Sequence, residues 1–351
     1  MGIKNLHDFF RSKIPNVYHI KNLSELKGTK FAIDTSIFMC KYKNIYGNGW
    51  LEGFYQLITT LLKNDIDFIF IFDSKPPPEK EEEREQRSIA RQKNNDRIKE
   101  IIKNWEDFLE KEEDKNEYVL EDFKDFSSIY SFLEKKKEKT TFLKSEIISY
   151  LQKLEKNMIP ILPEYFQLLR ELLRLMNISF YDADSEAEGT CSLMARKGLV
   201  DGVLTEDTDV MAYGSPLMFF NLNLQNETVN ILSLDDVLRE LEITFEHLQD
   251  FCIMCGTDYN SNMKNIGSKK SFKLVQTYGS LENISKHYDT SILNYERGRS
   301  LFHCEQYELK IDTFHLKEDI QTDTLPLQEF CFYHNIPFQR KERTDSLLKN
   351  I

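Results

Sequence analysis

Seven acidic residues stand in five short clusters that we expect at the ends of strands. Carboxylates gathered in one small volume repel one another, so their burial either raises their pKa values or recruits cations. An all-oxygen cluster without histidine or cysteine favours hard ions such as Mg²⁺ or Mn²⁺. Two such ions, about 3.5–4 Å apart, can clamp the attacking and the leaving oxygen of a phosphodiester. The seven residues are Asp34, Asp73, Glu186, Glu188, Asp207, Asp209 and Asp258.

Some of these clusters also have a simpler explanation when they are taken alone. Ser185-x-x-Glu188 has the spacing of a capping box, which needs no metal. Asp34 and Asp207 could cap helices that follow their strands. Capping does not explain why five clusters recur in order at strand ends, and we therefore favour a two-metal site.

Apolar patterning predicts the elements that position these residues. Runs at 30–36 and 67–73 are continuously apolar, which indicates strands buried on both faces of a parallel sheet. Between them, 50–64 has apolar residues at helical spacing and completes a βαβ unit. Further strands are predicted at 177–181, 201–205, 216–222 and 228–232, with a helix at 186–197. We expect an α/β fold with an open, mostly parallel central sheet flanked by helices, whose carboxyl edge carries the acidic residues.

A charged segment at 74–160 interrupts this pattern. After three consecutive prolines, four cations at helical spacing form one stripe: Lys80, Arg84, Arg87 and Arg91. Charge alone predicts a solvated helix, with Glu83 and Arg87 as an ion pair. Residues 104–140 contain 12 acidic and 7 basic residues, a net charge of −5. Their helically spaced apolar residues predict an amphipathic helical insert.

With these motifs the sequence resembles the flap endonuclease/XPG family of structure-specific 5′ nucleases. The resemblance covers most of the chain. The matching segments are Met-Gly-Ile-Lys-Asn-Leu at 1–6, Ala-Ile-Asp-Thr-Ser at 32–36, Phe-Asp-Ser-Lys-Pro-Pro at 72–77, Ser-Glu-Ala-Glu-Gly at 185–189, Thr-Glu-Asp-Thr-Asp-Val-Met-Ala-Tyr-Gly-Ser-Pro at 205–216, Gly-Thr-Asp-Tyr at 256–259 and Asn-Ile-Gly-Ser-Lys-Lys at 265–270.

The resemblance implies a PIN-like 5′ nuclease core with a helical arch and a helix-turn-helix DNA-binding element. The core would span 1–260, interrupted at 74–160 by the arch and the acidic insert. The helix-turn-helix element would span 256–290, and a C-terminal helical wrap of the core would span 291–351.

The resemblance also implies roles for individual residues. The seven carboxylates would hold two Mg²⁺ ions, for which Mn²⁺ can substitute. Lys80 and Arg87 fall where the family has a basic pair that contacts the scissile phosphate, so for these two the solvated-helix interpretation is set aside. The expected DNA contacts are Gly2 near the active site, Arg84 and Arg91 on the arch, and Gly267, Lys269 and Lys270 in the helix-turn-helix element, which in relatives also holds K⁺.

Three departures from the family pattern stand out. Cys40 stands near the position of a base-stacking tyrosine, for which Tyr42 is a candidate substitute. No clear sliding-clamp-binding motif is present, which leaves dependence on a clamp uncertain. The insert at 104–140 is too acidic to line a DNA path readily, so we expect it to lie outside the arch or to bind a protein partner.

Composition and charge further limit the class of protein to which the chain can belong. The 351 residues carry a net charge of −12, which argues against non-specific nucleic-acid binding by the whole surface but allows a local basic track. No apolar run approaches the roughly 20 residues that cross a bilayer. Six dispersed cysteines suit a reducing compartment, and Cys252-x-x-Cys255 lies in an apolar run that predicts core packing. We expect an intracellular, soluble monomer, in the nucleus or at the site of DNA replication.

These observations predict a 5′ flap endonuclease and 5′–3′ exonuclease acting in DNA replication, repair or recombination. Its partners would be DNA with 5′ flaps, junctions or free 5′ ends. Two alternatives remain: a catalytically silent scaffold that binds DNA junctions, and a ribonuclease of related fold. The seven carboxylates disfavour the scaffold because a binding module gains nothing from their repulsion, and the helix-turn-helix motif favours duplex DNA over RNA.

Overall fold

The computed structural model describes residues 2–111, 115–136, 139–303, 309 and 324–338. Contacts within the chain divide it into two units. The first comprises Met1–Lys41, Leu51–Glu81 and Leu162–Ile351, and the second comprises Tyr42–Trp50 and Glu82–Ile161. None of the described helices combines the length and apolar character that a membrane span requires.

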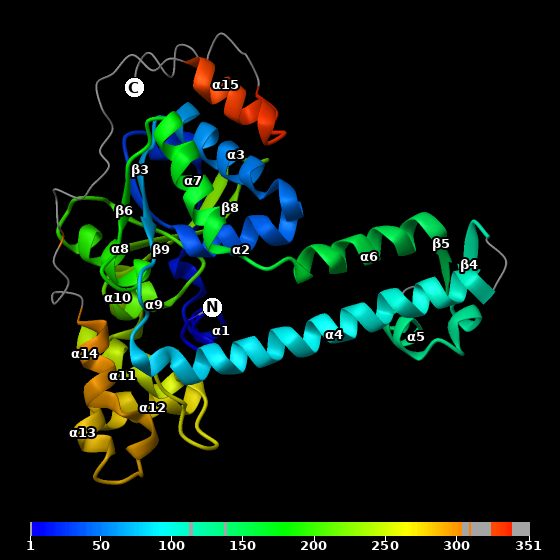
Figure 1. Cartoon of the computed structure of the whole chain (residues 1–351). Helices are drawn as coiled ribbons and strands as arrows, with labels where there is room; N and C mark the ends of the chain where they lie inside the picture. The colour runs from blue at the N-terminus through cyan, green and yellow to red at the C-terminus, as the bar shows by residue number, and fades with distance from the viewer. Residues whose placement is uncertain (1, 112–114, 137–138, 304–308, 310–323, 339–351) are drawn as a thin grey trace. The chain divides into compact units, whose positions relative to one another are not determined.

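A seven-stranded sheet forms the centre of the first unit, in the order β1-β9-β8-β7-β2-β3-β6 (Figure 1). The strands are β1 (Tyr18–Asn22), β2 (Lys30–Asp34), β3 (Asp67–Phe72), β6 (Phe180–Asp182), β7 (Gly202–Leu204), β8 (Leu217–Asn223) and β9 (Thr228–Ser233). Strands β8, β7, β2, β3 and β6 run parallel to their neighbours, and β9 and β1 continue the sheet in antiparallel pairs. The predicted α/β fold with a mostly parallel sheet is confirmed.

Helices flank this sheet and join its strands. They are α1 (Leu6–Lys13), α2 (Thr35–Tyr46), α3 (Trp50–Lys63), α7 (Pro163–Leu175), α8 (Ala187–Arg196), α9 (Asp209–Ala212), α10 (Leu234–Leu241) and α15 (Thr324–Tyr333). Helix α8 packs on β2, β3 and β7, and α3 makes the predicted βαβ connection between β2 and β3. Strand β1 was not predicted, because it is an edge strand whose residues are mostly exposed and polar.

The described residues beyond β9 are mostly helical. Helix α11 (Phe245–Cys255) packs on α12 (Ser268–Tyr278) and α14 (Tyr295–Phe302), with α13 (Leu281–Ile284) following α12. The predicted helix-turn-helix element at 256–290 contains α12 and α13 and begins directly after α11; its role in DNA binding stays a prediction. The buried, free thiols of Cys252 and Cys255 lie in α11, which confirms core packing. Much of the predicted wrap at 291–351 lies outside the described residues.

The second unit has its own elements and its own aromatic core. After the short 3₁₀ helix Pro78–Lys80, which belongs to the first unit, α4 runs over Glu81–Lys111; β4 (Glu117–Val119), α5 (Ser127–Glu134), β5 (Thr141–Leu143) and α6 (Lys144–Met158) follow. The core consists of Ile101, Trp105, Phe108, Tyr118, Phe123, Phe126, Ile129, Leu133, Phe142, Ile147 and Leu151.

The prediction of a helical insert at 104–140 is therefore wrong in part. Strands β4 and β5 pair in antiparallel register, with Tyr118 opposite Phe142. Both rings are buried in the aromatic core, whereas Val119 beside them is 46% exposed. The pairing joins segments more than 20 residues apart, so local helical spacing of apolar residues could not reveal it.

Candidate active site

The carboxyl edge of the sheet gathers the predicted acidic residues within the first unit. Asp34 ends β2 and Asp73 follows β3; Glu186 and Glu188 lie at the start of α8. Asp207 lies between β7 and α9, and Asp209 is the first residue of α9. Asp258 follows helix α11 instead, so the prediction that every cluster follows a strand is wrong for this residue. The loop after α11 nevertheless brings Asp258 to the same site, where its carboxylate faces Lys80.

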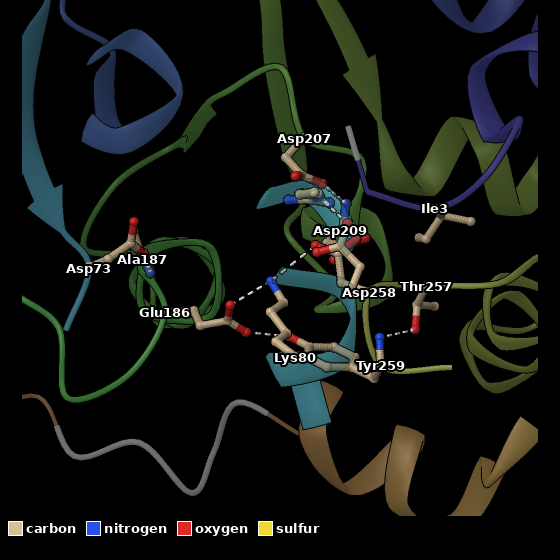
Figure 2. Close-up of polar contacts among 12 residues, drawn as sticks. Ile3, Asp73, Lys80, Glu186, Ala187, Asp207, Asp209, Thr257, Asp258 and Tyr259 are labelled. Atoms are coloured by element: carbon tan, nitrogen blue, oxygen red, sulfur yellow. Dashed lines mark hydrogen bonds and ion pairs between the residues drawn. The ribbon is translucent and has the colours of Figure 1, made fainter. Parts of the chain in front are cut away.

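Lys80 lies in the middle of this carboxylate cluster. Its ammonium nitrogen is 2.5 Å from Oε1 of Glu186 and 3.3 Å from Oδ2 of Asp258 (Figure 2). Burial alone would lower the pKa of Lys80, but the carboxylates of Glu188, Glu186, Asp209 and Asp258 together raise it above its usual value. Lys80 therefore stays positively charged and balances part of the negative charge.

Burial and mutual repulsion destabilise the charged form of several of these carboxylates. Burial, with the nearby Asp73 and Asp207, raises the pKa of Asp34 to about 8. Burial and neighbouring carboxylates also raise the pKa values of Glu188 and Asp209 well above their usual range. Both carboxylate oxygens of Asp209 are buried without a hydrogen-bond partner among the described residues. The site thus holds more buried carboxyl groups than Lys80 can balance, and the remaining ones either keep a proton or bind a cation.

Helix capping accounts for part of this geometry. Asp34 accepts a hydrogen bond from the backbone N–H of Ile37 at 3.3 Å, near the start of α2. Asp207 accepts one from Asp209 N–H at 3.0 Å, but the N-cap residue of α9 is Thr208, so Asp207 is not the predicted cap. The Ser185–Glu188 capping box does not form: the Ser185 hydroxyl donates to the carbonyl of Lys75. Asp73 instead accepts from the backbone N–H of Ala187 at 2.7 Å, which ties the end of β3 to the start of α8.

Two tyrosines complete the site, and the sequence reasoning missed both. The hydroxyl of Tyr259 donates to Oε2 of Glu186 at 2.5 Å, and the Lys80 nitrogen lies 5.2 Å from the centre of the Tyr259 ring (Figure 2). The hydroxyls of Tyr213 and Tyr259 are 2.8 Å apart. Burial and the neighbouring Tyr213 and Glu186 raise the pKa of Tyr259 well above its usual value, so it remains a hydrogen-bond donor. The sequence signal that could have identified Tyr259 is its position directly after Asp258 in the motif Gly-Thr-Asp-Tyr.

Gly2 lies against the same cluster. The backbone N–H of the next residue, Ile3, donates to the hydroxyl of Thr208 at 3.0 Å. A Cβ atom at Gly2 would stand 2.0 Å from Oδ1 of Asp207 and 2.7 Å from Oδ1 of Asp209, and the Gly2 φ angle is +79°. Only glycine fits this close approach, in a backbone conformation that other residues rarely adopt.

The remaining predicted residues lie in other parts of the chain. Arg84, Arg87 and Arg91 are exposed on α4 in the second unit, where Arg87 pairs with Glu83. Gly267 precedes α12, and Lys269 and Lys270 are exposed in its first turn. Tyr42 is only 3% exposed, which disfavours it as a base-stacking residue.

The side chains at this edge of the sheet offer oxygen ligands of the kind that a divalent cation prefers. The donors are carboxylates, and the unpartnered oxygens of Asp209 offer hard ligands. Among the residues that the structure describes, no three acidic, histidine or cysteine side chains form a ready-made metal-binding group. Lys80 draws Glu186 and Asp258 toward its ammonium, so metal binding would require these carboxylates to turn.

This fold, with a carboxylate-rich edge around one buried lysine, defines a PIN-like nuclease core. The XPG N-terminal domain matches residues 1–94 and the XPG I-region matches residues 177–258. The chain is 32% identical over 332 residues to a probable RAD2-like endonuclease of invertebrate iridescent virus 6, covering 86% of this chain and 79% of the relative. The chain belongs to the flap endonuclease/XPG family.

Further relatives and solved structures agree with this assignment. Flap endonuclease 1 of Candida albicans is 27% identical over 303 residues, covering 81% of this chain and 70% of the relative. Flap endonuclease-1 from Methanococcus jannaschii has a TM-score of 0.57 at 23% identity, covering 97% of this chain and 96% of the other. The catalytic core of Rad2 in complex with DNA substrate also has a TM-score of 0.57, at 18% identity, covering 99% and 85%. The two structural likenesses concern the fold.

Proposed function

We propose that this chain is a divalent-metal-dependent nuclease that cuts DNA at 5′ flaps and also degrades DNA from 5′ ends in the 3′ direction. The observation that carries the proposal is the buried carboxylate cluster around Lys80, in which both oxygens of Asp209 have no partner among the described residues. Burying so many like charges is costly unless cations bind them.

The residues of the site would have different roles in the reaction. Two Mg²⁺ ions, for which Mn²⁺ can substitute, would when bound to the seven carboxylates supply an activated water and neutralise charge on the scissile phosphate. Lys80 holds a fixed positive charge where a phosphate oxygen would approach the carboxylates. Tyr259 holds the Glu186 carboxylate through its hydroxyl, and Gly2, which has no Cβ, lets the N-terminal backbone lie against Asp207 and Asp209 without steric overlap.

The substrate proposal rests on the duplex-binding element and on the relatives. Gly267 precedes α12 and is exposed, so the backbone N–H groups of the first turn can approach a phosphate. Lys269 and Lys270 add positive charge there. Flap endonuclease 1 of Candida albicans is 27% identical to this chain over 303 residues, which favours a 5′ flap as substrate. A K⁺ ion at this element remains a prediction, as do Arg87 at the scissile phosphate and a role in replication, repair or recombination.

Cleavage of a double-flap DNA labelled at its 5′ end tests the proposal. Wild-type protein in Mg²⁺ should release a flap-length oligonucleotide, and EDTA should stop the reaction. Asp209→Ala should abolish cleavage and still bind DNA. Asp235→Ala, which removes an exposed carboxylate from α10, is the matched control and should cut like wild type.

Other outcomes decide between the alternatives. Release of mononucleotides alone would leave the nuclease assignment intact and make it an exonuclease. Tight junction binding with no cleavage in Mg²⁺ or Mn²⁺ would favour the silent scaffold, and preferential cutting of an RNA flap would favour a ribonuclease. Full activity of Asp209→Ala would refute the proposed site.

A further inference from the structure

A cavity of about 290 Å³ opens on the second unit, among α4, the C-terminal end of α5 and α6. Its polar lining comes from Asn94 and Arg97 on α4 and from Lys135 and Lys136, which directly follow α5. Its apolar lining consists of Ile98, Ile101, Phe132 and Leu154. We call this cavity the basic pocket.

The charged side chains that line the basic pocket are all positive. Three cations line it and no carboxylate does, although residues 104–140 have a net charge of −5 and the chain has one of −12. In the part of the chain that the structure describes, no ion pair joins Arg97 or Lys135 to another residue. A local excess of positive charge of this kind attracts anionic groups.

Aromatic side chains lie directly beside these cations. The Lys136 nitrogen is 5.3 Å from the centre of the Phe132 ring and 4.6 Å from the centre of the Tyr150 ring. The two rings meet edge to face with centres 6.3 Å apart, and Phe132 is half-buried. These contacts hold the Lys136 ammonium near the apolar floor. The pocket therefore offers positive charge and an apolar or aromatic surface within one small space.

We propose that the basic pocket binds a nucleotide of the single-stranded 5′ arm of a DNA substrate. Arg97, Lys135 and Lys136 would contact the phosphate, and the base would lie against Phe132 and the aliphatic floor. The inference rests on the proposed function, which supplies such a 5′ arm. The volume is at the lower end of the range for ligand pockets, about 300–1,000 Å³, so the pocket admits one nucleotide and not a run of them.

Single-stranded DNA fits this lining better than the other anionic polymers. Bases of a duplex are stacked inside the helix and would leave the apolar floor without a partner. An acidic peptide could pair with the cations but brings no flat ring for the floor. Single-stranded DNA presents a phosphate and an unstacked base on each unit, which matches both parts of the lining.

Binding of a fluorescent single-stranded DNA to the full chain in EDTA tests the inference without any cleavage. The pocket variant combines Arg97→Gln, Lys135→Gln and Lys136→Gln. Its control combines Lys93→Gln, Lys99→Gln and Lys153→Gln, which removes the same charge from exposed positions of α4 and α6 outside the pocket lining. Thermal unfolding of both variants verifies that they fold.

The pocket variant should bind single-stranded DNA about tenfold more weakly than the control, as expected for the loss of three partly exposed ion pairs. Its plot of log affinity against log salt should lose about 2 units of slope relative to wild type, at about 0.7 per cation. Duplex DNA should bind both variants equally. Equal affinity of the two variants for single-stranded DNA would overturn the inference, as would preferential loss of duplex binding.

Two further measurements complete the test. The first distinguishes failure of the inference from failure of the proposed function, and the second distinguishes single-stranded DNA from other ligands. Flap cleavage by the pocket variant should persist on a one-nucleotide flap, so loss of all cleavage there points to the catalytic site. Absence of cleavage by wild type would refute the proposed function and leave the binding comparison valid. Displacement of the DNA by an acidic peptide at a much lower concentration than unlabelled single-stranded DNA requires would assign the pocket to a protein and overturn the inference.

Discussion

The hydroxyl of Tyr259 lies 2.5 Å from Oε2 of Glu186, while the ammonium of Lys80 holds Oε1, the other oxygen of the same carboxylate. Glu186 is therefore held from both sides by donors that come from distant segments of the chain. This arrangement makes Tyr259 a positioning residue whose hydroxyl can be removed without removing its ring.

Tyr259→Phe should slow cleavage about tenfold, because one hydrogen bond to a buried carboxylate is lost, worth about 1.4 kcal/mol. The ring, and with it the contact to Lys80, remains. Single-turnover rates at saturating DNA check this, together with the Mn²⁺ affinity of the DNA-free protein. Tyr213→Phe, which removes a hydroxyl 2.8 Å from that of Tyr259, should have the smaller effect. A larger effect of Tyr213→Phe would contradict the assigned role.

Lys80→Met should reduce the cleavage rate by about 100-fold or more, the usual cost of removing a group that stabilises developing charge in a dry site. DNA affinity should change little, since one phosphate contact is lost. Lys75→Met is the control, because Lys75 is exposed in the same segment after β3. Equal rates for the two variants would show that Lys80 serves only to balance the carboxylates in the free protein.

Gly2→Ala should impair cleavage much more than Gly28→Ala. Both glycines have a φ angle of +79°, so both substitutions carry the same backbone strain. A Cβ at Gly28 meets nothing within 4 Å, whereas one at Gly2 overlaps Asp207. Rates of flap cleavage and thermal unfolding of the two variants separate strain from steric overlap. Equal loss of activity in both would exclude the overlap as the cause.

Asp34→Asn should stabilise the metal-free protein, increasingly so as the pH rises. The carboxyl of Asp34 ionises at 3.8 in an unfolded chain and at about 8 in the folded one. Between these values the unfolded state gives up a proton that the folded state keeps, so stability falls as the pH rises toward 8. The amide carries no charge and removes this dependence. Thermal unfolding in EDTA at pH 4, 6 and 8 should show a gain of a few degrees at pH 8 and little at pH 4.

Divalent metal should reverse the order of stability, so that wild type becomes more stable than Asp34→Asn. Carboxylates that bind Mg²⁺ stabilise the folded state by mass action, so wild type should gain more from added Mg²⁺ than Asp34→Asn does. A variant that remains the more stable protein in saturating Mg²⁺ would argue against Asp34 as part of a metal site.

Local patterns determined much of the core and of the acidic edge. Continuous apolar runs predicted β2 and β3 because a strand buried on both faces needs them, and the acidic residues follow these runs directly in the chain. The family motifs then pointed to Lys80 and Gly2, both of which lie at the acidic edge. Charge spacing alone described Lys80 as one cation of a solvated stripe.

Tertiary structure decided which side chains meet. Tyr259 and Glu186 are 73 residues apart, and Ile3 and Thr208 are 205 apart, so no local period records their contacts. Strands β4 and β5 pair across an intervening helix for the same reason. The net charge of the insert also does not show how its charges are distributed: Lys135 and Lys136 of the insert line one pocket with Arg97, and no carboxylate lines that pocket. Sequence determines the sum of charges, but packing determines where each charge lies.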